Sequence, residues 1–563
     1  MNIIVRQLNM IPIRQLYCVM ALMILAGQSL WAQDDTFIRE GEKIEGEVVI
    51  QKDLKIELPP ADRNFEKISP QNFSTADAQP LNYRTTDYPM TITDLSTHLR
   101  VLKIKSDDPS ELKGNYIKGG FGNYATPYLK GYFGMGKNPN ANFNLNVGHI
   151  SSARGPVDTR NSADGHTTIG LNGKFSAKKL KIGSFATYNR DKYHFYGYTP
   201  GVEISRDSIR QVYHSASIGI DFTTLDVEAP FKIRGDLSFS HISDRFDVSE
   251  NNVRANLGFD FELNDEVSVV TDVNTLFSKF TFGDTQNRSL VGVASGLRYK
   301  IKGFEAEGGF RFVLNNDTIA SVRKTSIFPW AKASYQLTEM ISAYASLDGN
   351  VHEVTLDKIS RENPFLRPGT SLAHTQNNLD LSGGFRGRLA NSVGFDAGFS
   401  LGNSKNLYFY QLFPEAANQF TMLYDDESTT YYSFQTSLSY SIQKVGGVAA
   451  DIKFIGYNTR AFDEAWHRPN FIANVNGWYN LYDKIMLKTD IFGIAGIRAL
   501  DPVSFETKEL KPAVDINLQA DYRFSDRWGA FLMVNNLLTR KYELLLNYPN
   551  RSILLIAGLS LEF

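Results

Sequence analysis

The last thirteen residues, Arg551 to Phe563, constrain the fold of this chain more than any other stretch. They read R-S-I-L-L-I-A-G-L-S-L-E-F. At the period of two residues that a β-strand imposes, one face is wholly apolar and the other becomes polar toward the end. A strand that ends on an aromatic residue, with no polar tail, is typical of a barrel whose outer face meets lipid. The stretch therefore predicts a transmembrane β-barrel, with Leu559, Leu561 and Phe563 as its C-terminal assembly signal for the outer-membrane barrel assembly machinery.

Composition is compatible with a barrel and excludes two other classes of protein. The chain has 563 residues, 12% of them aromatic, and its mean hydropathy is -0.26. After residue 30 no run of 18 apolar residues occurs, which excludes a helical membrane protein. A barrel remains allowed because only every second residue of a strand meets lipid. The formal net charge of -2 gives no basic excess, so nucleic acid is not an expected partner.

Residues 1–32 have the pattern of a signal peptide. An apolar core at residues 16–26 follows two arginines, and Ala32 offers a small residue for cleavage. Met10 begins a more ordinary signal peptide than Met1 does, and the sequence leaves the true start open. The one cysteine lies in this segment, so we expect a mature chain without disulfides. Such a leader implies export to the periplasm and insertion into the cell outer membrane.

Residues 33–113 differ in amino-acid composition from the rest of the chain. They are polar, and prolines recur at positions 59, 60, 70, 80 and 89, a density that resists both helices and strand pairing. Their apolar content is too low for an independent core. We predict an extended, largely irregular segment that forms either a short plug-like element in the lumen or a periplasmic arm.

Residues 114–563 alternate regularly between apolar and polar positions. Short turns alternate with longer polar loops along the chain, as in barrels with tight periplasmic turns and long external loops. The prediction is an all-β antiparallel barrel of about 22 strands that spans outer-membrane lipid. The strand candidates are 114–124, 126–135, 141–152, 165–176, 179–196, 207–224, 230–243, 251–262, 266–282, 287–301, 303–314, 321–337, 340–353, 371–388, 391–407, 418–441, 444–459, 468–480, 482–494, 510–523, 525–541 and 551–563.

Each strand candidate has one apolar and one polar face. In residues 251–262, Val253 and Phe261 share one face while Arg254 and Asp260 share the other, which suits lipid outside and water inside. Aromatic residues gather at predicted short-turn ends, where a membrane-interface girdle is expected; these are Trp478, Tyr479, Tyr482, Trp528 and Phe563. The candidate lumen-lining residues, which either contact a polar solute or solvate the wall, are His166, Lys174, Arg254, Asp260, Asp380, Arg386, Arg388, Asp515 and Asp521.

Two motifs in this context resemble those of TonB-dependent receptors, the class of 22-stranded outer-membrane transporters. The C-terminal part, from Met533 through Tyr542 to Phe563, is similar to the end of that family. A second segment is similar to the N-P-x-L-x-P motif that these barrels carry in an external loop. The resemblance covers about 114–563 and implies uptake of a solute too large for porins, with TonB as a partner. The family-like positions of the second segment are Asn363, Pro364, Leu366 and Pro368.

The resemblance to TonB-dependent receptors is only partial in the N-terminal part of the chain. Glu47, Val48, Val49 and Ile50 are similar to the short box by which these receptors contact TonB, although the same residues suit a plain β-strand. The segment that follows is shorter than the globular plug of the family. A lumen of 22 strands is wide enough to need closure. Residues 33–113, inward-folded external loops, or another envelope protein are the three candidates for closing it.

The sequence shows no constellation of catalytic or metal-binding residues. Its nine histidines are dispersed without the spacing of a metal site, and none is paired at useful spacing with a serine or an aspartate. We therefore expect neither an enzyme nor a cofactor. Two functions remain: an outer-membrane transporter that resembles a TonB-dependent receptor, and a plugless structural or assembly barrel that acts as partner of other cell-envelope proteins.

Overall fold

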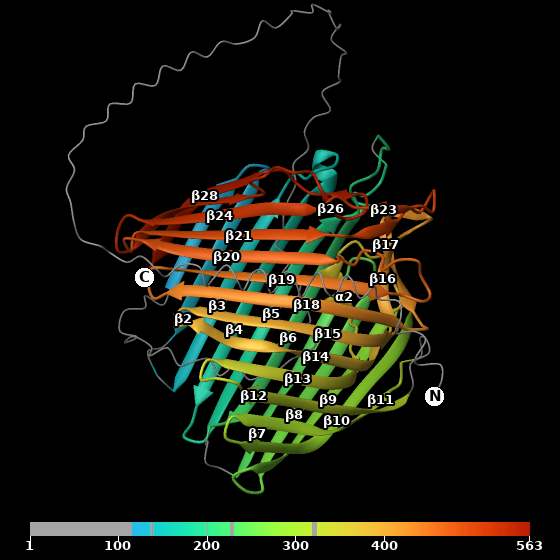
Figure 1. Ribbon diagram of the computed structural model, residues 1–563. Helices are drawn as coiled ribbons and strands as arrows, with labels where there is room; N and C mark the ends of the chain where they lie inside the picture. Colours follow the sequence, from blue (N-terminus) through green and yellow to red (C-terminus); the bar gives the residue numbers. More distant parts are fainter. Residues whose placement is uncertain (1–114, 136–137, 139, 200, 226–229, 318–323) are drawn as a thin grey trace, which may run out of the picture. The chain divides into compact units, whose positions relative to one another are not determined.

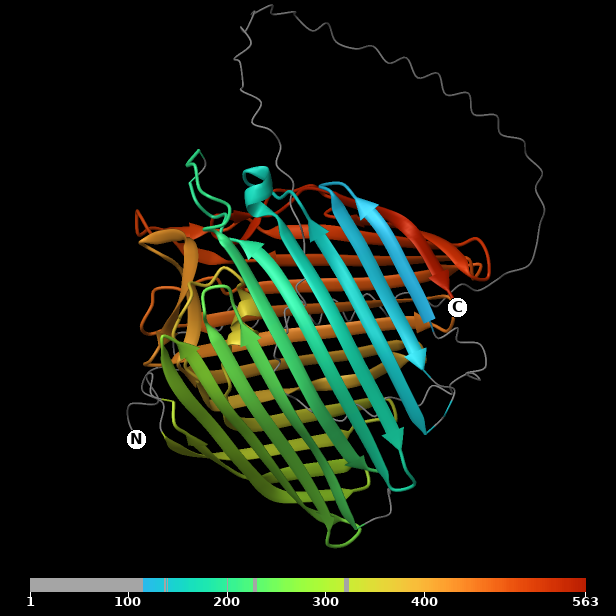
Figure 2. The same cartoon turned by 180° about the vertical axis from the view of Figure 1, so that it is seen from behind.

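The computed structural model describes residues 115–563 apart from 136–137, 139, 200, 226–229 and 318–323. The predicted signal peptide, the segment 33–113 and the box-like residues Glu47 to Ile50 lie outside the described residues. The described chain forms a closed antiparallel barrel of 22 strands (Figure 1, Figure 2), which confirms the predicted fold class.

The barrel closes between its first and last strands. β1 (Asn115–Gly122) pairs with β2 (Thr126–Met135) on one side and with β28 (Leu554–Glu562) on the other. The other barrel strands are β3 (Ala141–Ser152), β4 (Asp164–Ser176), β5 (Leu180–His194), β6 (Arg210–Thr224), β7 (Phe231–Ser243), β8 (Ser249–Glu262), β9 (Val267–Phe282), β10 (Asp284–Ile301), β11 (Phe304–Asn315), β12 (Thr325–Gln336), β13 (Ile341–His352), β14 (Thr375–Ala390), β15 (Val393–Lys405), β18 (Thr429–Ile442), β19 (Gly446–Asn458), β20 (Phe471–Leu481), β21 (Ile485–Ala495), β24 (Ala513–Arg523) and β25 (Trp528–Asn535).

The loops at one end contain further short elements. These are the 3-10 helix η3 (Thr159–Ser162), the helix α2 (Leu356–Glu362) and the hairpins β16 (Leu407–Phe413) with β17 (Ala416–Asp425), β22 (Arg498–Leu500) with β23 (Thr507–Glu509), and β26 (Glu543–Leu545) with β27 (Tyr548–Pro549). The side chain of Thr355 caps α2 by accepting a hydrogen bond from the backbone N–H of Lys358. Among the described residues, no helix is long and apolar enough to cross a membrane.

The prediction of a single strand at 418–441 is wrong. The chain turns between β17 and β18, and β17 pairs with β16 in a hairpin outside the barrel sheet. The break is made by the buried carboxylate of Asp425, which accepts hydrogen bonds from the backbone N–H of Glu427 at 3.2 Å and the hydroxyl of Thr429 at 2.7 Å. An aspartate that bonds to nearby groups in this way competes with the strand ladder and favours a turn.

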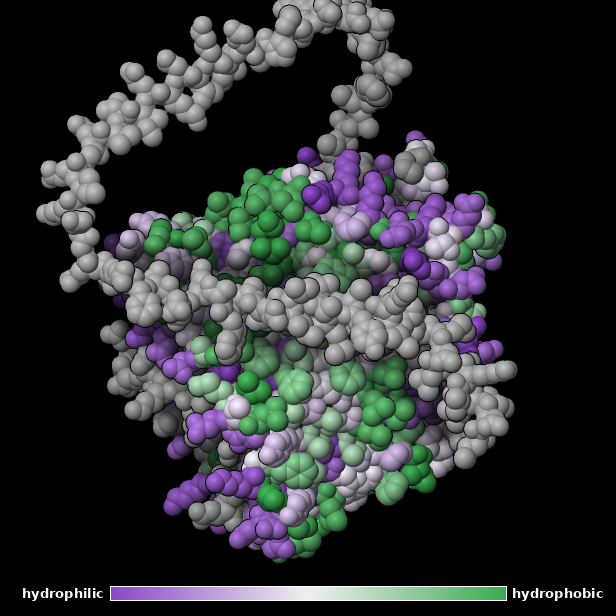
Figure 3. Space-filling view, in the orientation of Figure 1, coloured by the Kyte–Doolittle hydropathy of each residue, from purple (hydrophilic) through white to green (hydrophobic). Residues whose placement is uncertain are grey.

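The outer wall is an apolar belt. Large apolar residues on alternate positions are exposed on every side, for example Leu237 and Phe239 on β7 and Val253, Leu257 and Phe261 on β8. Figure 3 shows green apolar side chains over the middle of the strands and purple hydrophilic ones toward their ends. Exposure on this scale is unfavourable in water and favourable against lipid.

The short-turn end of the wall carries exposed aromatic residues, as predicted. Trp478, Tyr479, Tyr482, Trp528 and Phe563 are all exposed there. The last strand also follows its predicted facing, since Leu555 and Leu559 are exposed whereas Leu554 and Ile556 are fully buried against Phe531. Amphipathic rings at this level suit the boundary between lipid and water.

Candidate functional site: a lumenal cavity under a loop lid

Six long loops at one end of the barrel fold toward one another and form what we call the loop lid. It comprises the described residues of 195–209, 353–374, 406–428, 459–470, 496–512 and 536–553. Apolar side chains from five of these loops form one buried cluster with Tyr213 of β6 and Phe280 of β9. Figures 1 and 2 both place α2, part of this lid, within the ring of strands. The lid therefore crosses the lumen.

Tyr548 lies at the centre of the lid. Its ring stacks on Phe365 with centroids 3.7 Å apart and also lies 4.8 Å from Tyr196 and 5.8 Å from Phe420. Its hydroxyl donates to the backbone carbonyl of Asn418. One side chain thus joins four loops that are separated by between about 50 and more than 300 residues of the chain.

The predicted family-like motif is part of this centre. Asn363 is fully buried and its side-chain oxygen accepts a hydrogen bond from the backbone N–H of Phe365 at 3.0 Å. The carbonyl of Pro364 accepts from the hydroxyl of Tyr213 at 3.2 Å. Leu366 is buried and its backbone bridges to Phe420, while Pro368 is half-buried. The motif therefore holds one lid loop against both the wall and a second loop.

A buried ionic network bonds the lid to the wall. Arg288 of β10 lies 3.6 Å from the carboxylate of Glu250 on β8 and 3.2 Å from that of Asp317. All three side chains are at most 3% exposed. Arg288 also donates to the carbonyl of Val354 at 2.9 Å, and the backbone N–H of Leu356 donates to Glu250 at 2.6 Å. The start of the lid helix is thus fixed by charged groups that have no access to water.

His374 completes this network as a neutral group. The imidazole Nδ1 accepts a hydrogen bond from the backbone N–H of Val354 at 3.1 Å and lies 2.8 Å from a guanidinium nitrogen of Arg288. Burial, together with the positive charge of Arg288, lowers the pKa of His374 to about 2. A protonated ring would lose the acceptor and face a like charge.

His467 is a second buried, neutral histidine of the lid. Its Nδ1 donates to the carbonyl of Tyr410 at 2.7 Å, and its Nε2 accepts from the backbone N–H of Leu546 at 3.3 Å. The two bonds require the neutral ring with the proton on Nδ1. Burial lowers the pKa of His467 to about 4.

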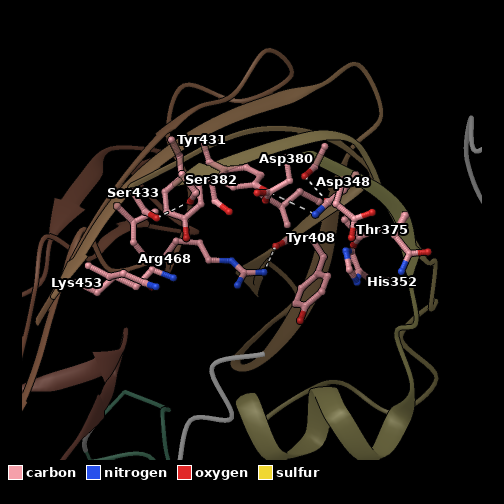
Figure 4. A pocket seen from close by; sticks show the side chains of 18 of the residues that line it. Asp348, His352, Thr375, Asp380, Ser382, Tyr408, Tyr431, Ser433, Lys453 and Arg468 are labelled. Atoms are coloured by element: carbon pink, nitrogen blue, oxygen red, sulfur yellow. Dashed lines mark hydrogen bonds between the residues drawn. The ribbon is translucent and has the colours of Figure 1, made fainter. Parts of the chain in front are cut away.

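A polar cavity of about 750 Å³ lies between the lid and the wall formed by β12 to β20. Four cationic side chains and four carboxylates line it, so its formal charge balances. The rest of the lining is rich in hydroxyl groups from serine, threonine and tyrosine (Figure 4). The charged residues are Lys332, Lys358, Lys453, Arg468, Asp348, Glu353, Glu362 and Asp380.

Tyrosines fix the charged groups of this cavity. The hydroxyls of Tyr408 and Tyr410 donate to the carboxylate of Glu362 at 2.7 Å and 2.8 Å, and Tyr431 donates to Asp380. The guanidinium of Arg468 lies 4.7 Å from the centre of the Tyr408 ring. Such a lining holds polar groups in place without a large net charge, which suits a polar organic solute.

Of the predicted lumen-lining residues, Asp380 alone lines the cavity. All nine lie on the strand face opposite the exposed apolar residues.

The other predicted residues contact groups elsewhere on the inner wall or the lid. His166 bonds to Asp191 at 2.8 Å, Arg254 pairs with Glu353 of the lid at 3.0 Å, and Asp260 pairs with Arg298. Arg386 lies 5.1 Å from the Tyr344 ring and Asp521 lies 2.5 Å from Lys118. Asp515 accepts from the backbone N–H of Ile516 at 2.8 Å, Lys174 is exposed and Arg388 is half-buried.

Sequence reasoning missed the residues that make the lid and most of the cavity. Glu250, Arg288 and Lys453 stand at inward-facing positions of their strands, so strand facing alone could have found them. Asp317, His374 and Arg468 lie in loops and carried no such signal. No group of three or more potential metal-ligating side chains occurs within the described residues.

The comparisons with known proteins identify the fold. No family model and no curated protein sequence matches the chain. Solved structures match it, among them the FrpB iron transporter from Neisseria meningitidis (TM-score 0.61, 10% identity, covering 80% of this chain and 81% of that one). A second is the ferric-catecholate import receptor Fiu from E. coli (TM-score 0.58, 10% identity, covering 80% of this chain and 82% of that one). A third is the pyoverdine outer membrane receptor FpvA from Pseudomonas aeruginosa (TM-score 0.58, 11% identity, covering 80% of this chain and 78% of that one).

At such identities the likeness is one of fold. The predicted resemblance to TonB-dependent receptors is confirmed at that level, because the chain has their 22-stranded barrel. The barrel is therefore of the outer-membrane type.

Proposed function

We propose that this protein is an outer-membrane transporter that takes up a polar organic solute, in the manner of a TonB-dependent receptor. The observation that carries the proposal is the cavity of about 750 Å³ between the lid and the wall of a receptor-type barrel, which is lined by charged and hydroxyl-bearing residues. A cavity of this size holds a drug-sized organic solute. The fold neighbours named as transporters and import receptors support the same class of function.

The long loops face the outside of the cell in this proposal, and the short turns face the periplasm. The solute enters when the lid opens and is held by the hydroxyl-rich lining. Opening toward the periplasm depends on TonB, which acts on residues 33–113. Residues Glu47 to Ile50 are the proposed contact for TonB, and the leader 1–32 is removed on export.

A second candidate is favoured by one observation. The lid is bonded to the wall by a buried ionic network, which suits a barrel that stays shut and serves as a partner of other envelope proteins. Such a role needs no solute in the cavity.

Uptake by whole cells separates the two candidates. Cells that produce the protein, and cells that lack it, are grown in a defined medium whose polar solutes are followed by mass spectrometry. A transporter removes at least one solute faster, stops when the proton gradient is collapsed, and slows when Asp380 and Lys453 in the cavity are replaced by Asn and Gln. Equal depletion by both strains, together with co-purification of envelope proteins in fixed ratio, would establish the structural role.

A further inference from the structure

The outer wall carries a cluster of positive charge at the long-loop end, which we call the basic patch. Its members are Arg190 and Lys192 on β5, Arg206 in the loop after β5, Arg210 at the start of β6, and Arg245 in the turn after β7. They surround a hollow of about 530 Å³. The patch is separate from the lumenal cavity, because none of its members lines that cavity.

Strand facing places the patch outside the barrel. On β5 the exposed residues Ile182 and Tyr188 share the face of Arg190 and Lys192. On β6 the exposed residue Ile218 shares the face of Arg210 and His214. The hydroxyl of Tyr188 lies 2.9 Å from Nδ1 of His214, which brings the two outer faces together. Figure 2 shows this side of the barrel.

The patch begins where the apolar belt ends. One row of paired residues crosses four strands on the outer face, from His149 to Thr167 to Arg190 to His214. The residues two positions below this row are Val147, Ile169, Tyr188 and Ala216. The row therefore marks the level at which the lipid tails stop and the headgroups begin.

Among the described residues, the five cations of the patch share the hollow with two carboxylates, Asp207 and Asp244. Asp207 pairs with Arg210 at 3.1 Å and is 73% exposed, whereas Asp244 accepts hydrogen bonds from the backbone N–H groups of its own turn. Arg190, Lys192 and Arg206 have no carboxylate within ion-pair distance among the described residues. Like charges held together in this way attract an anion.

The patch has no counterpart on β18 and β19. On the other side of the barrel the outward positions at the same end of β18 and β19 are Thr430, Gly456 and Asn458, which carry no charge. These two strands thus lack the positive charge of the patch, whereas Lys279 on β9 and Lys405 on β15 are single outward-facing cations at that end.

We propose that the basic patch binds the phosphorylated headgroup of a lipid in the outer leaflet. The phosphate oxygens accept hydrogen bonds from Arg190, Lys192 and Arg206, while the acyl chains lie on the apolar belt below, against Ile182 and Ile218. This site rests on the outward orientation of the long loops proposed above, and it is independent of solute uptake.

Native mass spectrometry of the purified full chain in detergent tests the site. The probe is lipid A carrying two phosphates, compared with the same lipid after phosphatase treatment. We expect the wild type to retain the phosphorylated lipid and the variant R190Q/K192Q/R206Q to bind it roughly a hundredfold more weakly, at about a factor of five for each cation removed. The variant K178Q/K300Q/K302Q removes three charges at the short-turn end and should bind as the wild type does.

Several outcomes would overturn the proposal. They are equal binding by the triple variant at the patch, equal binding of the dephosphorylated lipid, and displacement of the lipid by millimolar inorganic phosphate, which would indicate a site for the free anion. Folding is checked by the migration of the unheated barrel in detergent gels. If the triple variant does not fold, R206Q alone, in an exposed turn, should still weaken binding by about fivefold.

Discussion

The buried network at Arg288 should hold the lid closed, and its removal is the sharpest test of the lid. In the variant R288M, Glu250 and Asp317 remain buried at no more than 2% exposure and lose their only close cation among the described residues. The carbonyl of Val354 also loses its donor. Removing one partner of a buried pair typically costs about 3–5 kcal/mol.

The strands of the barrel remain paired in this variant, so the lost free energy destabilises the closed lid relative to the open lid. A change of about 3–5 kcal/mol corresponds to roughly 10²- to 4 × 10³-fold more frequent opening, at about 1.4 kcal/mol for each factor of ten. Amide hydrogen exchange measures this directly, since protection reports the free energy of local opening. We expect the amides of α2 and of residues 353–374 to exchange faster by that factor, while the strands β18 to β21 keep their protection.

The variant R254M is the matched control. Arg254 also pairs with the lid, through Glu353 at 3.0 Å, but the two side chains are 26% and 39% exposed. Such a pair is worth at most about 1 kcal/mol, so exchange should rise by less than about fivefold. Equal exchange in R288M and R254M, or no change in R288M, would refute the view that buried charge fastens the lid.

Three further perturbations have defined outcomes. His374 and His467 are neutral in the closed lid, because burial lowers the pKa of His374 from 6.5 to about 2 and that of His467 from 6.5 to about 4. Both side chains regain their ordinary pKa when the lid opens, so the stability of the closed lid is complete above pH 6.5 and falls as the pH drops below 6.5. Amide hydrogen exchange at about pH 7 and about pH 5, corrected for the intrinsic exchange rates, measures this loss. Replacing Tyr548 by Ala removes the ring that joins four loops and should destabilise the lid by about 3–5 kcal/mol, measured by protease cleavage within the lid. Replacing Ile218 by Arg on the lipid face should cost about 2–4 kcal/mol in unfolding from lipid vesicles, whereas Arg at the neighbouring inward-facing Ser217 should cost less.

The barrel was predictable because its signal is local. Alternation within each strand, as in Val253 to Phe261, decides which face meets lipid, and the turn residues decide where each strand ends. The 22 strand candidates follow from these two rules. The two rules fail at 418–441, where hydrogen bonds to the buried carboxylate of Asp425 separate two strands. No glycine or proline marks this break in the sequence.

The lid was not predictable because its contacts join distant parts of the chain. The hydroxyl of Tyr196 donates to the carbonyl of Pro549, 353 residues away, and Asn418 donates to the carbonyl of Phe195, 223 residues away. No periodicity within a loop encodes such a pairing. From the sequence, inward-folded external loops were only one of three candidates for closing the lumen.

Access to the lumenal cavity from outside the cell tests the central claim most directly. The variant C18S/S382C carries one cysteine, in the cavity shown in Figure 4, and C18S/S504C carries one in an exposed lid loop. Intact cells are treated with a maleimide that does not cross membranes. We expect S504C to react at once and S382C slowly, with the S382C rate rising about tenfold or more when R288M is added. Labelling of S382C as fast as that of S504C in the otherwise unchanged protein would contradict a lid that closes the cavity.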